Sequence, residues 1–227
     1  VAVGASVAVA QIRSENVALI DVTGGTVKAA NISVLAGTEA KPYDTEALAT
    51  VVTGAAGVTA VALNFAVAIN RSLNKAQAGG ASGSLIAEKE LKVRADGRTK
   101  AYGIVLNAAV GGISANVSMV WATLSSIQEA LLEGAATVTA GSLTVESVQN
   151  NSETTKRKDP VTVVIDTAKK FTKTITPDSM AQAFIFSASA SAVSITANAA
   201  VATADAVSRA KVNVNNIRVS GNIKVNN

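Results

Sequence analysis

The chain has 227 residues, of which 48% are hydrophobic but only 3% aromatic, and its 20 basic and 16 acidic side chains give a formal net charge of +4. It contains neither histidine nor cysteine, which excludes imidazole acid–base catalysis, thiol nucleophiles, disulfide bonds and the usual zinc, haem and iron–sulfur ligand sets, so no cofactor is predicted. The small basic excess does not indicate a nucleic-acid partner. With 44 Ala and 31 Val, any core must be built from small side chains.

The first half of the chain predicts strands rather than membrane helices. It begins with Val1 and shows no signal-peptide pattern nearby, so we expect a segment excised from a longer protein. Residues 47–70 and 101–128 are uncharged and long enough for a transmembrane helix. Their large apolar residues fall on alternate positions, as at Phe65 and Val67, which is the period of a strand. No membrane span is therefore predicted.

A strand of mixed polarity recurs four times along the chain. The copies are residues 26–34, 85–93, 137–145 and 217–225. In each copy apolar residues alternate with polar or charged ones, which predicts one buried and one solvated face. The last two copies lie further apart in the sequence than the others do. The apolar residues that align between the copies are Ile32, Leu91, Leu143 and Ile223.

A second type of strand precedes the mixed strand in each copy. Residues 64–68 match residues 116–120 at a shift of 52 and then residues 196–200 at a further shift of 80, and residues 6–10 fit the same frame. Large residues alternate with Ala, so both faces are apolar, which predicts strands covered on both sides. Equivalent strands are expected to begin at Ala49, Ala101 and Ala181.

These repeats predict an all-β fold, a β-solenoid in which successive copies stack. No copy could bury its apolar face alone, whereas stacking at about 4.8 Å per rung pairs the backbone polar groups of neighbouring copies. The expected repeat copies are residues 1–48, 49–100, 101–149 and 181–227. The period of about 52 residues fits two coils of about 26 residues or three of about 17. A rod of about ten rungs, near 50 Å tall, is expected. Short helical turns are conceivable only at residues 45–50, 124–132 and 199–210.

The extra length of the last spacing falls on residues 150–180, where the alternation stops. An insertion projecting from the solenoid is expected here, with a hairpin or strand pair formed by residues 161–165 and 171–175. Its basic side chains are candidates for contacting sulfated or acidic glycans or an acidic protein surface. These binding candidates are Lys156, Arg157, Lys158, Lys169, Lys170 and Lys173. The alternative is a solvated insertion that only covers an apolar side of the solenoid.

The sequence predicts neither catalytic residues nor a metal site. Ser72 and Lys75 form a Ser-x-x-Lys string, but they are expected in a polar connection between strands rather than at the start of a helix in a pocket. The acidic residues are scattered, whereas a β-helical polysaccharide lyase or hydrolase, the alternative function, would need clustered carboxylates or a basic set facing one groove. Met119 and Trp121 share a face with Val117 and are predicted to be core residues.

The strings at residues 4–10, 64–70 and 26–34 resemble the repeats of very large filamentous adhesins of Gram-negative bacteria, namely the leukotoxin-type filamentous adhesins and, more distantly, haemagglutinin-like exoproteins. The resemblance, one of composition and period, covers almost the whole chain outside the insertion. It implies a right-handed parallel β-helix, export by a type V or two-partner route, and display as a long fibre at the bacterial cell surface. It brings no catalytic residues.

The predicted function is therefore that of a structural segment in a fibre shaft, which holds a distal binding tip away from the cell. The expected partner of the insertion is a glycan or protein of the host cell surface. Copies of the segment can also stack end to end, because the outer strands of a solenoid segment have open edges.

Overall fold

The computed structural model describes residues 1–149 and 181–227, and nearly all of them lie in β-strands. Every strand pairing among them is parallel, and β3 pairs with each of the other four strands. The all-β fold with a parallel sheet that was predicted from the sequence is confirmed. In chain order the strands are β1 (Ala2–Ala36), β2 (Tyr43–Ala56), β3 (Thr59–Gln149), β4 (Ala181–Val219) and β5 (Ile223–Asn226).

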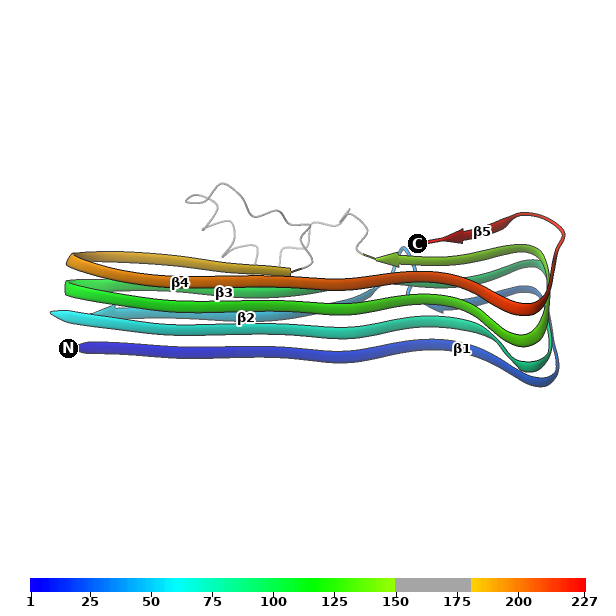
Figure 1. The fold of residues 1–227 in the computed structure, drawn as a ribbon, viewed down its shortest axis with the longest axis horizontal. Coiled ribbons are helices and arrows are strands. Elements are labelled where there is room, and N and C mark those ends of the chain that lie inside the picture. The colour runs from blue at the N-terminus through cyan, green and yellow to red at the C-terminus, as the bar shows by residue number, and fades with distance from the viewer. Residues whose placement is uncertain (150–180) are drawn as a thin grey trace.

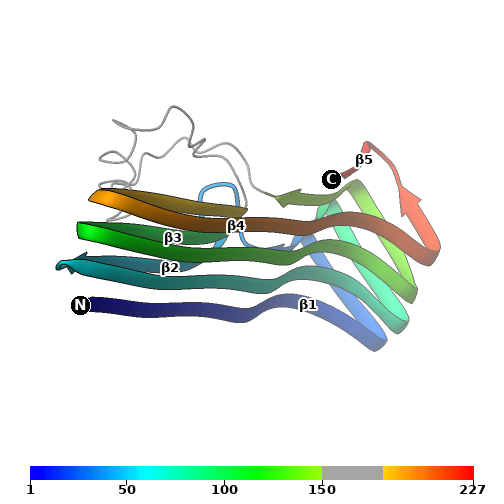
Figure 2. The same cartoon turned by 60° about the vertical axis from the view of Figure 1, so that its left-hand side comes forward.

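The strands run along the long axis of the molecule (Figure 1). The chain runs out along one side, bends, returns along the other side and then begins the next pass beside the first (Figure 2). Each such pass is termed a level, and the first long part of a level is termed its outgoing segment. The four levels are residues 2–56, 60–110, 113–149 with 181–190, and 193–226. The outgoing segments are residues 2–22, 60–80, 114–134 and 194–214.

One period of the sequence makes one level, not two or three coils. Ala2 pairs with Ala60 and Tyr43 pairs with Gly97, so a full sequence period separates neighbours in adjacent levels. Neither of the divisions that the sequence left open, into coils of about 26 or about 17 residues, is present, because the strands are much longer than the usual five or six residues. Four levels are about 19 Å high, whereas an outgoing segment is about 70 Å long. The long axis follows the strands, and the expected rod of ten rungs is not formed.

The column of aliphatic side chains predicted from the mixed strand is present in the core. Ile32 pairs with Leu91, and Leu143 pairs with Ile223, as the alignment of the mixed strands predicts. Ile32, Leu91 and Leu143 belong to a single cluster of buried apolar residues. Full burial of a leucine side chain stabilises the fold by about 1.5–3 kcal/mol, so this column is a main source of stability.

In the outgoing segments the register between the second and third levels differs from the predicted one by two positions. The side-chain amide of Asn74 donates a hydrogen bond to that of Gln128, with an N···O distance of 2.7 Å. Together with the backbone hydrogen bond that the Ile113 amide donates to the Val58 carbonyl, this contact gives a shift of 54 rather than 52, so Asn64 lies beside Ser118 and not beside Asn116. A slip of two positions leaves each side chain on the same face of a strand, which is why the apolar pattern did not reveal it.

The return side shows the same difference of two positions. Ala101 pairs with Ala181 as predicted, but its partner in the first level is Ala47 rather than Ala49. No helix among the described residues is long and apolar enough to cross a membrane. The stretches where helical turns were conceivable lie within β2, β3 and β4, at residues 45–50, 124–132 and 199–210.

The bend at the end of the outgoing segments depends on stacked glycines. Gly80 and Gly134 have φ angles of 143° and 118°, which non-glycine residues rarely adopt. A Cβ on Gly80 would lie 2.2 Å from the carbonyl oxygen of Val22 in the level below, and a Cβ on Gly134 would lie 2.2 Å from the carbonyl oxygen of Gly80. Only glycine allows the levels to approach this closely at the bend.

The two faces of the outgoing segments differ in exposure. Inward side chains such as Ala66 and Ala68 are buried between the two sides of the molecule. Outward side chains are exposed, including Met119 at 45% and Trp121 at 47%. The prediction that both faces are covered is therefore wrong for the described part of the chain, and so is the prediction that Met119 and Trp121 are core residues.

Candidate functional site

The basic residues predicted to bind a glycan or an acidic partner, and the hairpin expected around them, lie outside the described residues. The structure therefore neither groups nor separates these side chains. They are Lys156, Arg157, Lys158, Lys169, Lys170 and Lys173.

The Ser-x-x-Lys string does not form a catalytic pair. Ser72 and Lys75 both lie within β3, so the expectation that they occupy a connection between strands is wrong. They are three positions apart in a strand, which places their side chains on opposite faces. Ser72 points inward and is buried, whereas Lys75 lies on the outer face. The lysine amine therefore cannot activate this serine hydroxyl.

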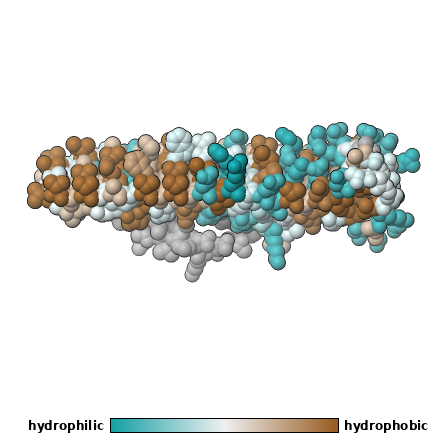
Figure 3. All heavy atoms as spheres, turned by 90° about the horizontal axis from the view of Figure 1, so that it is seen from below, coloured by the Kyte–Doolittle hydropathy of each residue, from teal (hydrophilic) through white to brown (hydrophobic). Residues whose placement is uncertain are grey.

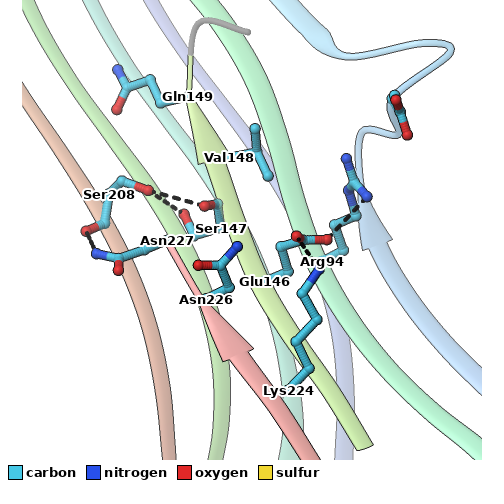
Figure 4. A pocket seen from close by; sticks show the side chains of 10 residues that line it. Arg94, Glu146, Ser147, Val148, Gln149, Ser208, Lys224, Asn226 and Asn227 are labelled. Atoms are coloured by element: carbon cyan, nitrogen blue, oxygen red, sulfur yellow. Dashed lines mark hydrogen bonds and ion pairs between the residues drawn. The ribbon is translucent and has the colours of Figure 1, made fainter.

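An open hollow of about 540 Å³ lies beside the end of β3 and the short strand β5 (Figure 4). Its lining is mostly polar and comes from three different strands, from Glu39 between β1 and β2, and from Asn227 after β5. Arg94 and Glu146 belong to β3, Ser208 to β4, and Lys224 and Asn226 to β5. Sequence positions that are far apart meet here because the levels stack in parallel register.

A chain of alternating charges crosses this hollow. The Arg94 guanidinium contacts the Asp96 carboxylate at 2.7 Å and the Glu146 carboxylate at 3.0 Å. The other oxygen of Glu146 accepts a hydrogen bond from the Lys224 ammonium group at 2.9 Å. Asp96, Arg94 and Glu146 are largely shielded from water, whereas Lys224 is exposed. The four charges compensate one another and connect the second, third and fourth levels.

The pKa of Glu146 reflects this arrangement. Burial raises the pKa, but the hydrogen bond from Lys224 and the positive charges of Arg94 and Lys224 lower it more, so the pKa lies below the ordinary value of 4.5. Glu146 is therefore ionised at neutral pH and is not a proton donor there. Glu146 with its partners Arg94 and Lys224 is termed the clamp. Its chemistry suits an ionic connection between levels rather than a general acid.

The serine hydroxyls of the hollow are also engaged with each other and with the backbone. The Ser147 hydroxyl donates to the Gln128 carbonyl at 3.0 Å and lies 2.9 Å from the Ser208 hydroxyl. The Asn227 amide donates to the Ser208 carbonyl at 3.1 Å. A nucleophilic serine needs a base that removes its proton, and neither a carbonyl nor a second hydroxyl has that function. Within residues 1–149 and 181–227, no three acidic side chains are grouped as a metal site would require.

Sequence reasoning missed this charge chain, although a signal for it is present. Arg94 and Glu146 are separated by the same shift of 52 that relates Leu91 to Leu143 in the mixed strand. Applying that shift to charged residues as well as apolar ones would have paired them. Lys224 was predicted on the solvated face of the mixed strand, and it is exposed.

Buried amides in the interior differ in their hydrogen bonding. In one row, termed the amide ladder, the Asn16 amide donates to Asn74 at 2.8 Å and the Asn74 amide donates to Gln128 at 2.7 Å and to the Ala36 carbonyl at 2.9 Å. Elsewhere, the side-chain nitrogen and oxygen of Asn64 and of Asn116 are buried and have no hydrogen-bond partner among residues 1–149 and 181–227. These groups lie in the interior of the stack, and the ladder is a structural connection between levels.

No protein-family model matches this chain, and neither a curated protein sequence nor a solved structure matches it.

Proposed function

We propose that this chain is a structural segment of a right-handed parallel β-helix, the shaft of a secreted fibre or adhesin displayed at the surface of a bacterial cell. The observation that carries the proposal is the continuous parallel register between levels, which keeps residues such as Ile32 and Leu91 in one column. The repeats resemble those of filamentous adhesins, which implies export by a type V or two-partner route. The function of such a segment is to add length and stiffness to a fibre.

The path of the chain supports this architecture. In Figure 1 the outgoing segments lie in front, the return side lies behind, and the levels rise from β1 to β4, which is a right-handed sense of rotation. β1 and β4 each pair with β3 along one edge. A stack of this kind can be extended at a free edge with no change of register, as a shaft requires.

Surface display is tested directly on the cells that produce the protein. Antibodies raised against the purified chain should label intact cells, and external protease should remove the label while a cytoplasmic marker stays intact. Labelling that appears only after lysis would contradict the proposal. Because this experiment reports location alone, negative-stain electron microscopy of the labelled material should also show the label along fibres.

The polar hollow favours one alternative, a β-helical polysaccharide lyase or hydrolase, because Arg94 and Lys224 are of the charge type that acidic polysaccharides bind. Incubation with a panel of acidic polysaccharides separates the two functions. We expect no new reducing ends and no unsaturated products, since the charges of Arg94 and Lys224 are already compensated by Asp96 and Glu146. Cleavage of a polysaccharide that is lost in the Glu146→Gln variant would contradict the shaft proposal and support the enzyme function.

The adhesive part of the proposal concerns the basic insertion. Its motivation is the sequence, where Lys156, Arg157 and Lys158 are adjacent. Binding of the chain to heparin-like glycans should weaken as salt is raised and should be lost when these three residues are replaced by Gln. Replacing Lys28, which already pairs with Glu88 at 3.1 Å, is the matched control. Equal loss in both variants would contradict a specific contribution of the insertion.

A further inference from the structure

The outer side of the outgoing segments carries a large apolar surface at the end where each level begins. The strand register places the same four outward positions of each level side by side. Every side chain at these positions is apolar, and together they are termed the apolar face. Its residues are Val3, Ala5, Val7 and Val9; Val61, Leu63, Phe65 and Val67; Ala115, Val117, Met119 and Trp121; and Ile195, Ala197, Ala199 and Val201.

In the part of the chain that the structure describes, the apolar face is open to solvent. Val7 is 70% exposed, Ile195 is 64% exposed and Phe65 is 38% exposed. Seen from the free edge of the lowest level, apolar side chains gather toward the end where β1 begins, and polar side chains become commoner toward the bend (Figure 3). Exposing this many apolar groups to water is unfavourable, so we expect this surface to be buried against a partner.

The size of the surface fits a protein interface. A stretch of about seven strand residues across four levels measures about 23 Å by 19 Å, which is a projected area of about 450 Å². That is comparable with the largest apolar patches of monomers, about 300–600 Å², which are often functional. The whole outer side of the outgoing segments has a projected area of about 1,300 Å², more than the roughly 800 Å² that each partner buries in a standard interface.

The charges beyond the apolar face indicate which partner fits. Arg13 and Arg71 of the lower two levels share an outward column with Asp205 of the fourth level, through Ser125 of the third. In a neighbouring column, Lys75 of the second level is followed by Glu129 of the third, as the register of the amide ladder requires. A half-turn about an axis along the strands exchanges the first level with the fourth and the second with the third. It brings Arg13 opposite Asp205 and Lys75 opposite Glu129 of another copy, and along the described outgoing segments no two like charges face each other.

We propose that a second copy of this chain packs face to face on the apolar face, with the strands of the two copies running in the same direction and their levels stacked in opposite directions. The apolar face becomes the core of an isologous interface, and the charged columns become its rim. This pairing goes beyond the proposed function and does not depend on it. Surface labelling of cells and self-association of the purified chain can each fail without the other.

The first test measures the mass of the purified chain by analytical ultracentrifugation over a range of concentrations. We expect a monomer–dimer equilibrium in which the emission of Trp121, on the apolar face, shifts to shorter wavelength as the dimer forms. Phe65→Lys should raise the dimer Kd by about 10- to 100-fold, as expected for an aromatic residue at the centre of an interface. Thr50→Lys adds the same charge on the outer side of β2, where Thr50 is exposed, and should leave the Kd unchanged.

The second test exchanges charges in the rim, which avoids any change in the apolar face. Glu129 already pairs with Arg209 of its own chain at 3.0 Å, so Arg13 and Asp205 are the better pair to change. Arg13→Asp or Asp205→Arg alone should raise the Kd by about fivefold, because each creates a like-charge contact across the interface. The double variant should return the Kd to within about twofold of the original, which only a contact between these two positions explains.

Three results would overturn the pairing. One is a chain that stays monomeric at all concentrations while circular dichroism shows it folded. Another is end-to-end growth into chains that Phe65→Lys does not weaken, since that contact uses the free edges of β1 and β4. The third is a monomer that binds phosphatidylcholine vesicles through the apolar face, with the Trp121 shift produced by vesicles and not by concentration.

Discussion

The interior of the molecule is built differently at its two ends. Near the bend, where the two sides of the stack diverge in Figure 2, the core contains Leu85, Leu91 and Leu143. At the other end the interior consists mainly of small side chains, such as Ala62 and Ala66. Large apolar groups fill a wide interior, while alanine lets two sheets approach closely. The wide end is therefore stabilised mainly by apolar burial, and the narrow end depends more on backbone pairing and on close approach.

The largest expected effect is the loss of a leucine from the wide core. Leu91→Ala should lower the free energy of unfolding by about 2–5 kcal/mol, because Leu91 is fully buried in the aliphatic column and its removal leaves a cavity. Urea denaturation measures the change. Val52→Ala is the control, since Val52 is 70% exposed on the return side, and it should change stability by less than about 0.5 kcal/mol. Similar losses in both variants would remove the distinction between core and surface.

The bend that separates the two ends depends on glycine. Gly80→Ala should cost about 2–4 kcal/mol, because an added Cβ meets the backbone of Val22 and the φ of 143° is unfavourable for alanine. Gly24→Ala measures the cost of the positive φ angle without a steric clash, since Gly24 has a φ of 89° but no atom lies within 4 Å of an added Cβ. Gly54→Ala, which has open space and no positive φ, should be neutral or slightly stabilising. Urea unfolding of the three variants should give losses in the order Gly80, Gly24, Gly54, and any other order would contradict the stacked bend.

A third comparison concerns buried amides with and without hydrogen-bond partners. Asn74→Ala should destabilise the protein by about 1–3 kcal/mol, because it leaves the polar groups of Asn16, Gln128 and the Ala36 carbonyl without their partner. Asn64→Ala removes an amide that has no hydrogen-bond partner and should be close to neutral or stabilising. Thermal unfolding followed by circular dichroism measures both. An equal cost for the two substitutions would mean that Asn64 is as well satisfied as Asn74.

The sequence predicted which apolar residues of successive levels align in columns better than it predicted the path of the chain. The mixed strand has bulky residues on one face only, so Ile32 and Leu91 were aligned correctly. In the Ala-rich strands a shift of two positions preserves the pattern, and Asn64 was matched with Asn116 in place of Ser118. The length of a level was not readable, because strand alternation continues through the outgoing segments without turn signals that would divide the period into shorter coils.

The outer faces and the polar hollow were harder to predict for a different reason. Apolar residues on both faces of a strand are typical of a strand covered on both sides, so Trp121 was assigned to the core. No part of residues 1–149 and 181–227 covers that side, and it becomes the apolar face. The charge chain of Arg94, Glu146 and Lys224 forms because these residues lie in neighbouring levels. The repeat spacing shows which residues become neighbours, but a search for catalytic motifs does not use that spacing. The basic candidates at 150–180 lie outside the described residues and stay a prediction.

The smallest expected effect is the pH dependence of the clamp at the hollow. Because the pKa of Glu146 is lowered in the folded state, the clamp stabilises the protein above the unfolded value of 4.5, and this contribution is lost as the pH falls through the folded pKa. Glu146→Gln should therefore be less stable than the original at pH 7, by less than about 1 kcal/mol because Lys224 is exposed and Arg94 keeps its contact with Asp96, and the difference should vanish in acid.

The control for this experiment is Glu88→Gln, which disrupts the exposed pair with Lys28. Exposed pairs contribute little, so its stability should follow that of the original protein at every pH. Urea unfolding of all three proteins at several pH values between neutrality and pH 3 gives the comparison. A difference between Glu146→Gln and the original that persists unchanged into acid would mean that the glutamate stabilises the stack through packing or neutral hydrogen bonds. The clamp would then connect the levels through packing and neutral hydrogen bonds rather than through charge.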